Sequence, residues 1–257
     1  MQDLTVSLVQ TNQYWEDKAK NIKMYSEMLN SVSHTDLIVL PEMFHTGFTM
    51  NVKDMAESKE KGEGLEWLKR TAFEKNAAIY TSLILKEGTN YYNSGVFVLP
   101  TGDVKIYNKR KSFCLANEDL YFKAGEEEII VDYLGWKFQL QICYDLRFPE
   151  LVRNRIKKDL SPAYDAIIYV ANWPERRSLH WKSLLQARAI ENQCYVLGVN
   201  RIGHDFNDLS YSGASRVVDP LGIETIIPNN EKQILTTTIS SIHLSKTRES
   251  LPFLKDQ

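Results

Sequence analysis

Hydrophobic residues along this chain follow two spacings, one typical of strands and one typical of helices. Residues 4–10 (LTVSLVQ) alternate and are rich in valine and leucine, which predicts a strand. In residues 21–32 the apolar positions recur every three or four residues, which predicts a helix. The short apolar run 36–42 (DLIVLPE) is interrupted by Pro41, as expected of a strand that is covered on both faces.

The same two spacings continue through the rest of the chain. Helices are predicted over 64–75 and 178–193, and a further helix is predicted to start at Pro149 and continue through 150–156. Strands are predicted over 77–85, 136–143, 165–172 and 194–200, and over 93–108 as a hairpin that turns at 100–103. Strands and helices alternate but hairpins lie between them, so we expect an α/β fold with two sheets or one large mixed sheet and helices outside. Because no linker or repeat interrupts the pattern, residues 1–257 are predicted to form a single domain.

Composition and charge exclude several classes of protein. Hydrophobic residues make up 43% of the chain and the formal net charge is −2, so no overall positive field would recruit nucleic acid or an anionic membrane. The first residues do not resemble a secretory signal, and no apolar run reaches the ~18 residues of a membrane span. Three widely spaced cysteines, an odd number, argue against a disulfide scaffold and favour a cytoplasmic protein.

Common cofactor and metal motifs are missing from the sequence. There is no G-x-S-x-G, no Walker A loop and no G-x-G-x-x-G, and neither H-x-x-x-H nor C-x-x-C occurs. We therefore expect no cofactor and no metal.

Three of the predicted strands end in an ionisable residue: Glu42, Lys109 and Cys143. In α/β folds the carboxyl ends of strands converge on the ligand crevice, so we expect these three groups to lie together. A carboxylate can take the proton of a thiol and an ammonium can stabilise the resulting anion, which indicates nucleophilic catalysis. An inert, buried cysteine is the structural alternative, but alternation in 136–143 predicts that Cys143 shares a face with Gln139 and Gln141.

The segments around these residues resemble a known family. LPEMFHTGF, YNKRKSF and ICYDLRFPEL, with ARAIEN downstream, are similar to the catalytic segments of the nitrilase, or carbon–nitrogen hydrolase, superfamily. The resemblance implies a four-layer α-β-β-α sandwich and a homodimer. It also implies that Cys143 is the nucleophile, Glu42 the general base and acid, and Glu118 a second glutamate that orients the triad or the water. Lys109 and the backbone N–H of Tyr144 would stabilise the oxyanion.

Two segments, ANEDLYFKAG and ANWPERRSLHW, resemble the bacterial ω-amidase branch of that superfamily. This implies hydrolysis of the terminal amide of small 2-oxo acid monoamides, 2-oxoglutaramate and 2-oxosuccinamate. A substrate carboxylate needs a cationic pocket. Candidates for that pocket are Arg147, then Arg176, Arg177 and Lys111, with Trp173 and Phe113 as walls.

Several alternatives remain open from the residues alone. Arg147 could form a structural ion pair, Trp173 could belong to the core, and Lys111, where relatives often have histidine, could point to solvent. The activity could be that of another small-amide or nitrile hydrolase, or of an acyl transferase. In other classes, Cys143 and Cys114 could form a redox sensor, or the fold could be a non-catalytic binding module. Cys194 begins an apolar strand and is expected to be packed.

Overall fold

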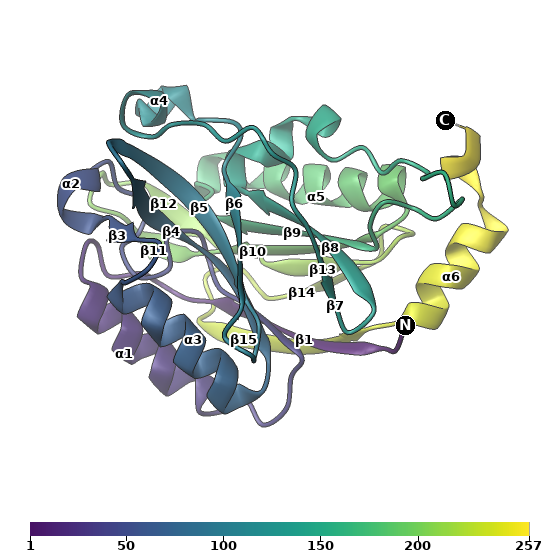
Figure 1. The fold of residues 1–257 in the computed structure, drawn as a ribbon, viewed down its shortest axis with the longest axis horizontal. Coiled ribbons are helices and arrows are strands. Elements are labelled where there is room, and N and C mark those ends of the chain that lie inside the picture. Colours follow the sequence, from purple (N-terminus) through teal and green to yellow (C-terminus); the bar gives the residue numbers. More distant parts are fainter. Residues whose placement is uncertain (257) are drawn as a thin grey trace.

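The computed structural model describes residues 1–256, whose strands build two large mixed sheets and one small hairpin (Figure 1). In the first sheet the strands lie in the order β15-β1-β2-β4-β5-β6, and β3 pairs with β4. Parallel pairs occur at its centre, where β1, β2 and β4 lie side by side, and antiparallel pairs at its edges. The strands of this sheet are β1 (Leu4–Gln10), β2 (Leu37–Val39), β3 (Glu57–Ser58), β4 (Ala78–Glu87), β5 (Asn90–Val98), β6 (Val104–Asn108) and β15 (Gln233–Ile239).

The second sheet has the order β14-β13-β10-β9-β8-β7, again with parallel strands at its centre. Its strands are β7 (Ile130–Tyr133), β8 (Trp136–Ile142), β9 (Ala166–Ala171), β10 (Tyr195–Asn200), β13 (Arg216–Val218) and β14 (Glu224–Ile226). The separate hairpin pairs β11 (Ile202–His204) with β12 (Ser210–Ser212).

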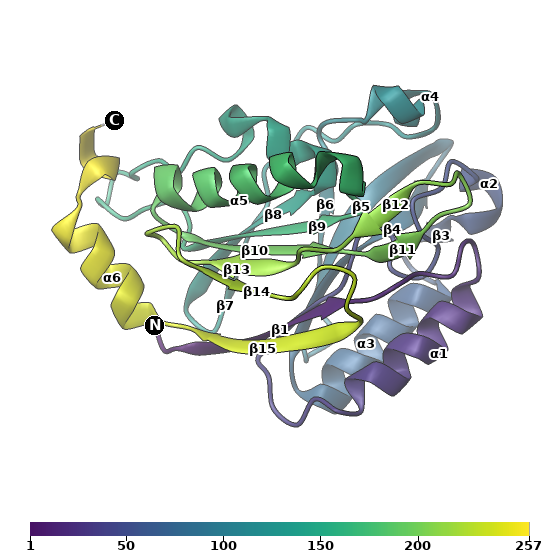
Figure 2. The same cartoon turned by 180° about the vertical axis from the view of Figure 1, so that it is seen from behind.

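Helices cover the outer face of each sheet (Figures 1 and 2). Helices α1 (Lys18–Leu29) and α3 (Glu63–Lys75) pack on the first sheet, and α5 (Ser178–Asn192) packs on the second. The layers therefore run helix, sheet, sheet, helix, which confirms the predicted α-β-β-α sandwich. The remaining helices are short or lie at the ends of the layers: α2 (Val52–Met55), α4 (Glu118–Tyr121) and α6 (Ser241–Ser250).

The largest apolar core lies between the two sheets. Leu8 and Tyr80 from the first sheet pack with Phe138 and Val170 from the second, and all four are fully buried. Burying one such side chain contributes about 1.5–3 kcal/mol relative to its exposed state. The sheets are therefore held face to face by hydrophobic burial, which fixes the ends of their strands relative to one another.

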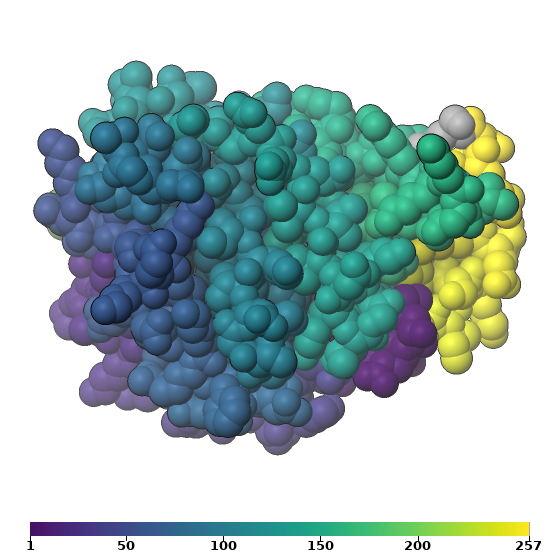
Figure 3. Space-filling view, viewed as in Figure 1, coloured from purple at the N-terminus to yellow at the C-terminus, as the bar shows by residue number. Residues whose placement is uncertain are grey.

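The first residues of the chain lie beside α6 at the edge of the sandwich, where Figure 3 shows them in purple next to the yellow C-terminal segment. Strand β15 pairs antiparallel with β1 along its whole length, from Gln10 opposite Gln233 to Leu4 opposite Ile239. Asp3 then accepts a 2.7 Å hydrogen bond from the backbone N–H of Ser241 at the start of α6. Within residues 1–256, no helix has the length and apolar character needed to span a bilayer.

Most of the predicted elements occur near their predicted positions. The 93–108 hairpin forms with its turn between β5 and β6, and 178–193 becomes α5. The helix predicted over 21–32 begins earlier, at Lys18, because the Asp17 side chain caps it by accepting from the Lys20 N–H.

The helix predicted from Pro149 through 150–156 is wrong. Pro149–Leu151 is a single 3₁₀ turn, and the chain then leaves the helical path. The cause is Asn154, which is fully buried: its side chain donates to the carbonyls of Tyr164 and Asn192, and its N–H donates to the Asn192 side chain. These bonds hold the backbone in a loop, and the local apolar spacing is not sufficient to override them.

Candidate active site

The first sheet supplies two of the three predicted catalytic groups. Glu42 lies three residues beyond the end of β2, Lys109 directly follows β6, and both side chains are buried. The Lys109 Nζ lies 3.3 Å from Glu42 Oε1. The hydrophobic strand before each residue therefore delivers a charged group to the same end of the sandwich.

The second sheet supplies the thiol, at a sharp turn. Strand β8 ends at Ile142, and Cys143 begins a 3₁₀ turn, Cys143–Arg147, with a positive φ of 44°. Asp145 stabilises the turn because its carboxylate accepts from the Ile142 N–H at 3.0 Å and from the Tyr107 hydroxyl at 2.8 Å. A non-glycine residue in this left-handed conformation is a local strain of the kind found at functional sites.

This turn corrects the strand prediction for 136–143. Alternation stops at Ile142, so Cys143 does not continue the face of Gln139 and Gln141. Those two glutamines are themselves fully buried. Cys143 is partly exposed because the turn lifts it out of the sheet into a cavity, with Sγ 3.9 Å from the Asn172 carbonyl oxygen.

Glu118, from α4, is the main partner of the lysine. Both of its carboxylate oxygens lie 2.9 Å from Lys109 Nζ, and it also accepts from the Phe113 N–H at 2.6 Å. Burial opposes the charge of Lys109, but the carboxylates of Glu118 and Glu42 outweigh that effect and raise the lysine pKa above its usual value. Lys109 is therefore a permanent cation beside the thiol.

Two asparagines that sequence reasoning missed hold the general-base candidate. The Asn93 side chain donates to Glu42 Oε1 at 2.8 Å and to Glu118 Oε1 at 3.2 Å. The Asn172 N–H donates to Glu42 Oε2 at 2.8 Å, and the Asn172 side chain donates to the Glu42 carbonyl at 2.7 Å. Asn93 lies within the predicted 93–108 hairpin and Asn172 ends the predicted 165–172 strand, but neither position alone indicates a partner.

The environment keeps the resting thiol protonated. Burial raises the pKa of Cys143 well above its usual value, the nearby Glu42 charge raises it further, and Lys109 only partly offsets both effects. A thiol is nucleophilic only as the thiolate. A reaction at this sulfur would therefore require loss of its proton, and Glu42 is a buried carboxylate close enough to influence the thiol pKa.

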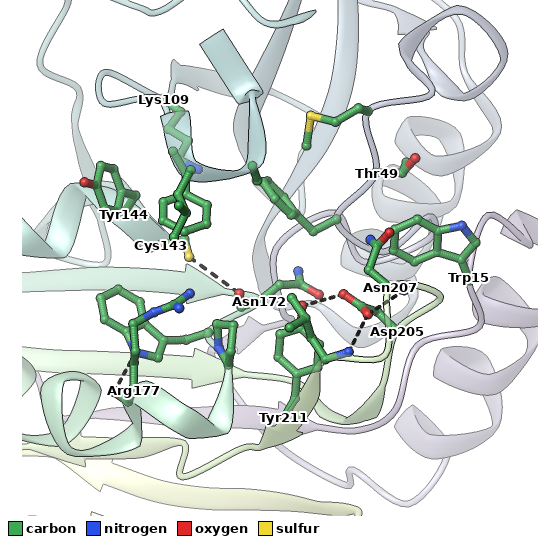
Figure 4. A pocket seen from close by; sticks show the side chains of 18 of the residues that line it. Trp15, Thr49, Lys109, Cys143, Tyr144, Asn172, Arg177, Asp205, Asn207 and Tyr211 are labelled. Atoms are coloured by element: carbon green, nitrogen blue, oxygen red, sulfur yellow. Dashed lines mark hydrogen bonds between the residues drawn. The ribbon is translucent and has the colours of Figure 1, made fainter. Parts of the chain in front are cut away.

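Cys143 opens into a cavity of about 520 Å³ at this end of the sandwich (Figure 4). Lys109, Tyr144 and Asn172 contribute to its wall beside the sulfur. Tyr144 stands in the first turn of the 3₁₀ segment, where a backbone N–H has no acceptor within the helix. Its N–H is therefore available to a ligand oxygen.

Two arginines line one side of this cavity on an aromatic support. The Arg147 guanidinium lies 4.6 Å from the Trp173 ring centre, and that of Arg177 lies 5.3 Å from the Phe113 ring centre. The Arg147 guanidinium lies 3.2 Å from His180 Nδ1, and within residues 1–256 neither guanidinium forms an ion pair with a carboxylate, so the structural ion pair considered for Arg147 is absent. Burial lowers the pKa of Arg177, and the neighbouring cations Arg176 and Arg147 lower it further.

The other sequence candidates lie differently. Lys111 is not part of the cavity wall; its ammonium lies 3.8 Å from Glu150 and over the Phe148 ring. Arg176 also lies outside the wall. Trp173 is both buried and part of the wall, so the two readings of it are compatible. Cys114 is exposed and lies outside the wall, whereas Cys194 is fully buried as expected.

The chain is similar to known proteins along its whole length. The chain is 40% identical to omega-amidase YafV of Escherichia coli K12 over 258 residues, which covers all of this chain and 97% of that protein. It is 33% identical to 2-oxoglutaramate amidase of Bacillus subtilis, with 98% and 96% of the two chains covered. Its fold matches the crystal structure of XC1258 from Xanthomonas campestris, a CN-hydrolase superfamily protein with an arsenic adduct in the active site, with a TM-score of 0.97, 39% identity and coverage of 100% and 98%.

The family model for carbon-nitrogen hydrolases matches residues 5–249, nearly the whole described chain. That match includes both sheets and all of the groups that surround the cavity. The chain is a member of the carbon-nitrogen hydrolase family, in its nitrilase-like fold, and resembles the ω-amidases within it.

Proposed function

We propose that this enzyme hydrolyses the terminal amide of small 2-oxo acid monoamides, such as 2-oxoglutaramate and 2-oxosuccinamate, to the dicarboxylate and ammonia. Cys143 forms the thioester intermediate, Glu42 and Lys109 complete the catalytic triad, and Glu118 orients it. The two relatives named ω-amidase and 2-oxoglutaramate amidase support the substrate class.

One observation carries the proposal: two arginines without a carboxylate partner among residues 1–256 share the cavity with the thiol. A monoamide of a dicarboxylic acid has an anionic end and an amide end. Arg147 and Arg177 supply donors for the carboxylate, and Cys143 stands in the same cavity for the amide carbon. Trp173 and Phe113, which support the guanidinium groups, are flat walls suited to a small planar acyl group.

In the first half-reaction, Cys143 Sγ attacks the amide carbon as Glu42 takes the thiol proton. The tetrahedral oxyanion accepts hydrogen bonds from Lys109 Nζ and from the Tyr144 N–H. Each such donor typically contributes about 3–4 kcal/mol of transition-state stabilisation. Glu42 then gives the proton to the leaving nitrogen, the C–N bond breaks, and ammonia departs.

In the second half-reaction, Glu42 takes a proton from water, which attacks the thioester carbon. The C–S bond breaks, Glu42 returns the proton to sulfur, and the acid is released. A single carboxylate serves both steps because each step leaves it in the protonation state that the next one needs. Glu118 and Asn93 touch Lys109 and Glu42 rather than the substrate, so they act as positioning residues.

The alternative classes fit the site less well. A redox sensor needs an accessible thiolate, whereas burial raises the Cys143 pKa. Cys114, its proposed partner, is exposed outside the cavity. A binding module would not require an acid and a lysine around a thiol. Nitrile hydrolysis and acyl transfer would use the same triad, and the substrate test below distinguishes nitrile hydrolysis from amide hydrolysis.

Ammonia release tests the proposal with 2-oxoglutaramate, glutamine, asparagine and a simple nitrile, using wild type and Cys143→Ala. We expect turnover of 2-oxoglutaramate by the wild type alone, with an acyl adduct on Cys143 detectable by mass spectrometry. Turnover of the nitrile alone would overturn the substrate class. Undiminished activity of Cys143→Ala would overturn the nucleophile assignment.

By the same resemblance we propose that the protein is a cytoplasmic homodimer. Sedimentation equilibrium of the purified chain tests the oligomeric state, and a mass equal to that of one chain at micromolar concentration contradicts it.

A further inference from the structure

The cavity continues beyond the space that a primary amide needs. Its volume of about 520 Å³ falls within the ~300–1,000 Å³ of pockets that enclose drug-sized ligands. Figure 4 shows Trp15, Thr49 and Asn207 across the cavity from Arg177, with Asn172 between the two sides. We call the region lined by Trp15, Glu16, Thr49, Asn51, Asp205 and Asn207 the far compartment.

The far compartment differs in charge from the arginine side. Glu16 and Asp205 are its two charged residues, and within residues 1–256 neither pairs with a lysine, arginine or histidine. Their oxygens accept only from neutral donors: the Glu16 carboxylate from Thr49 and Asn51, and the Asp205 carboxylate from the Tyr211 hydroxyl and backbone N–H groups.

Buried Arg201 does not neutralise this charge by direct contact. Its guanidinium packs on the Tyr211 ring at 4.7 Å. Its hydrogen bonds go to neutral oxygens of Asn12, Gln13, Ile202 and His204, and none goes to Asp205. Arg201 and Asp205 nevertheless attract each other through space, so the charge of Asp205 is partly offset. The cavity therefore has two arginines without a carboxylate partner at one side, and the Glu16 carboxylate with a partly offset Asp205 at the other.

The proposed reaction indicates which end of the substrate lies at each side of the cavity. If the carboxylate of the acyl group lies at Arg147 and Arg177, as in the proposed function on which this inference rests, the amide nitrogen points away from them. We propose that the far compartment receives the amine part of a secondary amide, and that it prefers an amine carrying a second, cationic nitrogen. The substrate class is then a 2-oxo acid amide of a short diamine.

Hydrolysis of such a secondary amide needs no reacting group besides Cys143, Glu42 and water. Cys143 forms the C–S bond as its proton passes to Glu42, the C–N bond of the secondary amide breaks, and Glu42 gives the proton to the departing amine. Water then hydrolyses the thioester as before. The diamine takes the place of ammonia, and the acid product is unchanged.

The test compares three N-substituted 2-oxoglutaramates with the unsubstituted amide, following 2-oxoglutarate formation by the wild type. The substituents are 2-aminoethyl, propyl, which has the same size without charge, and carboxymethyl, which carries the opposite charge. We expect kcat/KM for the aminoethyl amide to exceed that for the propyl amide at least about fivefold, with the carboxymethyl amide slowest. Equal values for the aminoethyl and propyl amides, or no turnover of any substituted amide, overturn the inference.

Two variants test whether the preference among substituted amides arises in the far compartment. Glu16→Gln keeps the size of the side chain and removes its charge, and is expected to reduce the aminoethyl-to-propyl ratio at least about twofold. Asn207→Trp fills the far compartment from an exposed position and is expected to slow the substituted amides at least tenfold more than the unsubstituted one. The exposed residues Glu127 and Asn229 provide matched controls, Glu127→Gln and Asn229→Trp, which should leave both ratios unchanged. Unchanged ratios in Glu16→Gln and Asn207→Trp would contradict the assignment.

The same rate measurements distinguish a failure of this inference from a failure of the proposed function. Loss of the preference among substituted amides, with normal turnover of 2-oxoglutaramate, overturns the far compartment alone. Absence of turnover of 2-oxoglutaramate itself overturns the proposed function.

Discussion

Asn93 offers the sharpest test of how the site is held. Its side chain is 2% exposed, and its single amide nitrogen donates to Glu42 at 2.8 Å and to Glu118 at 3.2 Å. Within residues 1–256 its carbonyl oxygen has no partner, so the side chain acts only as a donor between two carboxylates. Asn93→Leu removes both hydrogen bonds and keeps a similar volume.

The expected loss of kcat follows from the charge of the two carboxylates that accept these hydrogen bonds. A hydrogen bond to a charged group contributes about 1.5–3 kcal/mol, and the bond to Glu42 orients the base that takes the thiol proton. If that orientation is lost in the transition state, kcat falls about 10- to 150-fold. Asn93 is not part of the cavity wall, so KM should change less than about threefold.

The assay is steady-state hydrolysis of 2-oxoglutaramate together with thermal unfolding. Asn154→Leu is the matched control because Asn154 is equally buried and hydrogen-bonded but lies in a loop away from the cavity. It should lower Tm and leave kcat unchanged. A folded Asn93→Leu protein with kcat within twofold of the wild type would refute the positioning role, and so would a loss confined to KM.

The described contacts support three further predictions. Arg147→Met and Arg177→Met should each raise KM for 2-oxoglutaramate about 10- to 100-fold, whereas Lys111→Met, whose residue lies outside the cavity wall, should change it less than twofold in the same initial-rate assay. Cys114→Ser should retain wild-type kcat, whereas Cys143→Ser should lose at least 99% of it; equal losses would support a two-cysteine mechanism instead. Burial opposes ionisation of Glu57, but its hydrogen bonds from His45 and the Gly64 N–H, with Lys18 nearby, lower its pKa from 4.5 to about 2. The ionised carboxylate therefore stabilises the fold by about 3 kcal/mol above pH 4.5, and this contribution is lost as the pH falls towards 2. Calorimetry should therefore show a Tm deficit in Glu57→Gln that is full at neutral pH and shrinks through that window; a deficit independent of pH would contradict the ionic origin.

The central strands could be predicted from the sequence because their apolar runs are long and unambiguous. Residues 4–10, 36–42 and 165–172 are buried on both faces, and each became a parallel strand flanked by two others. Strand β15 was not predicted because QILTTTI is rich in threonine and only partly buried. It exists because β1 offers it seven residues of backbone pairing, a partner more than two hundred residues away.

The residues of the candidate site likewise fall into a group that could be predicted from the sequence and a group that could not. Glu42, Lys109 and Cys143 could be identified because each follows a recognisable strand. Asn93 and Asn172 could not be identified, because their importance lies in contacts with Glu42, which is far from both in the sequence, and local spacing does not encode such contacts. The positive φ of Cys143 is likewise set by Asp145 and the packing beneath the turn, so alternation extended one residue too far.

The pairing of β15 with β1 has a consequence for the order in which the protein is made. All of the proposed catalytic groups lie between residues 42 and 144, yet the edge of the sheet that carries Glu42 and Lys109 is completed by residues 233–239. During synthesis at about 5–20 residues per second, on the order of ten seconds or more pass between the synthesis of β1 and that of its partner β15. A ribosome-bound chain that ends before β15 thus already contains every proposed reactive group while the β1 edge of the first sheet is still unpaired, and the chain must be nearly finished before that edge is closed.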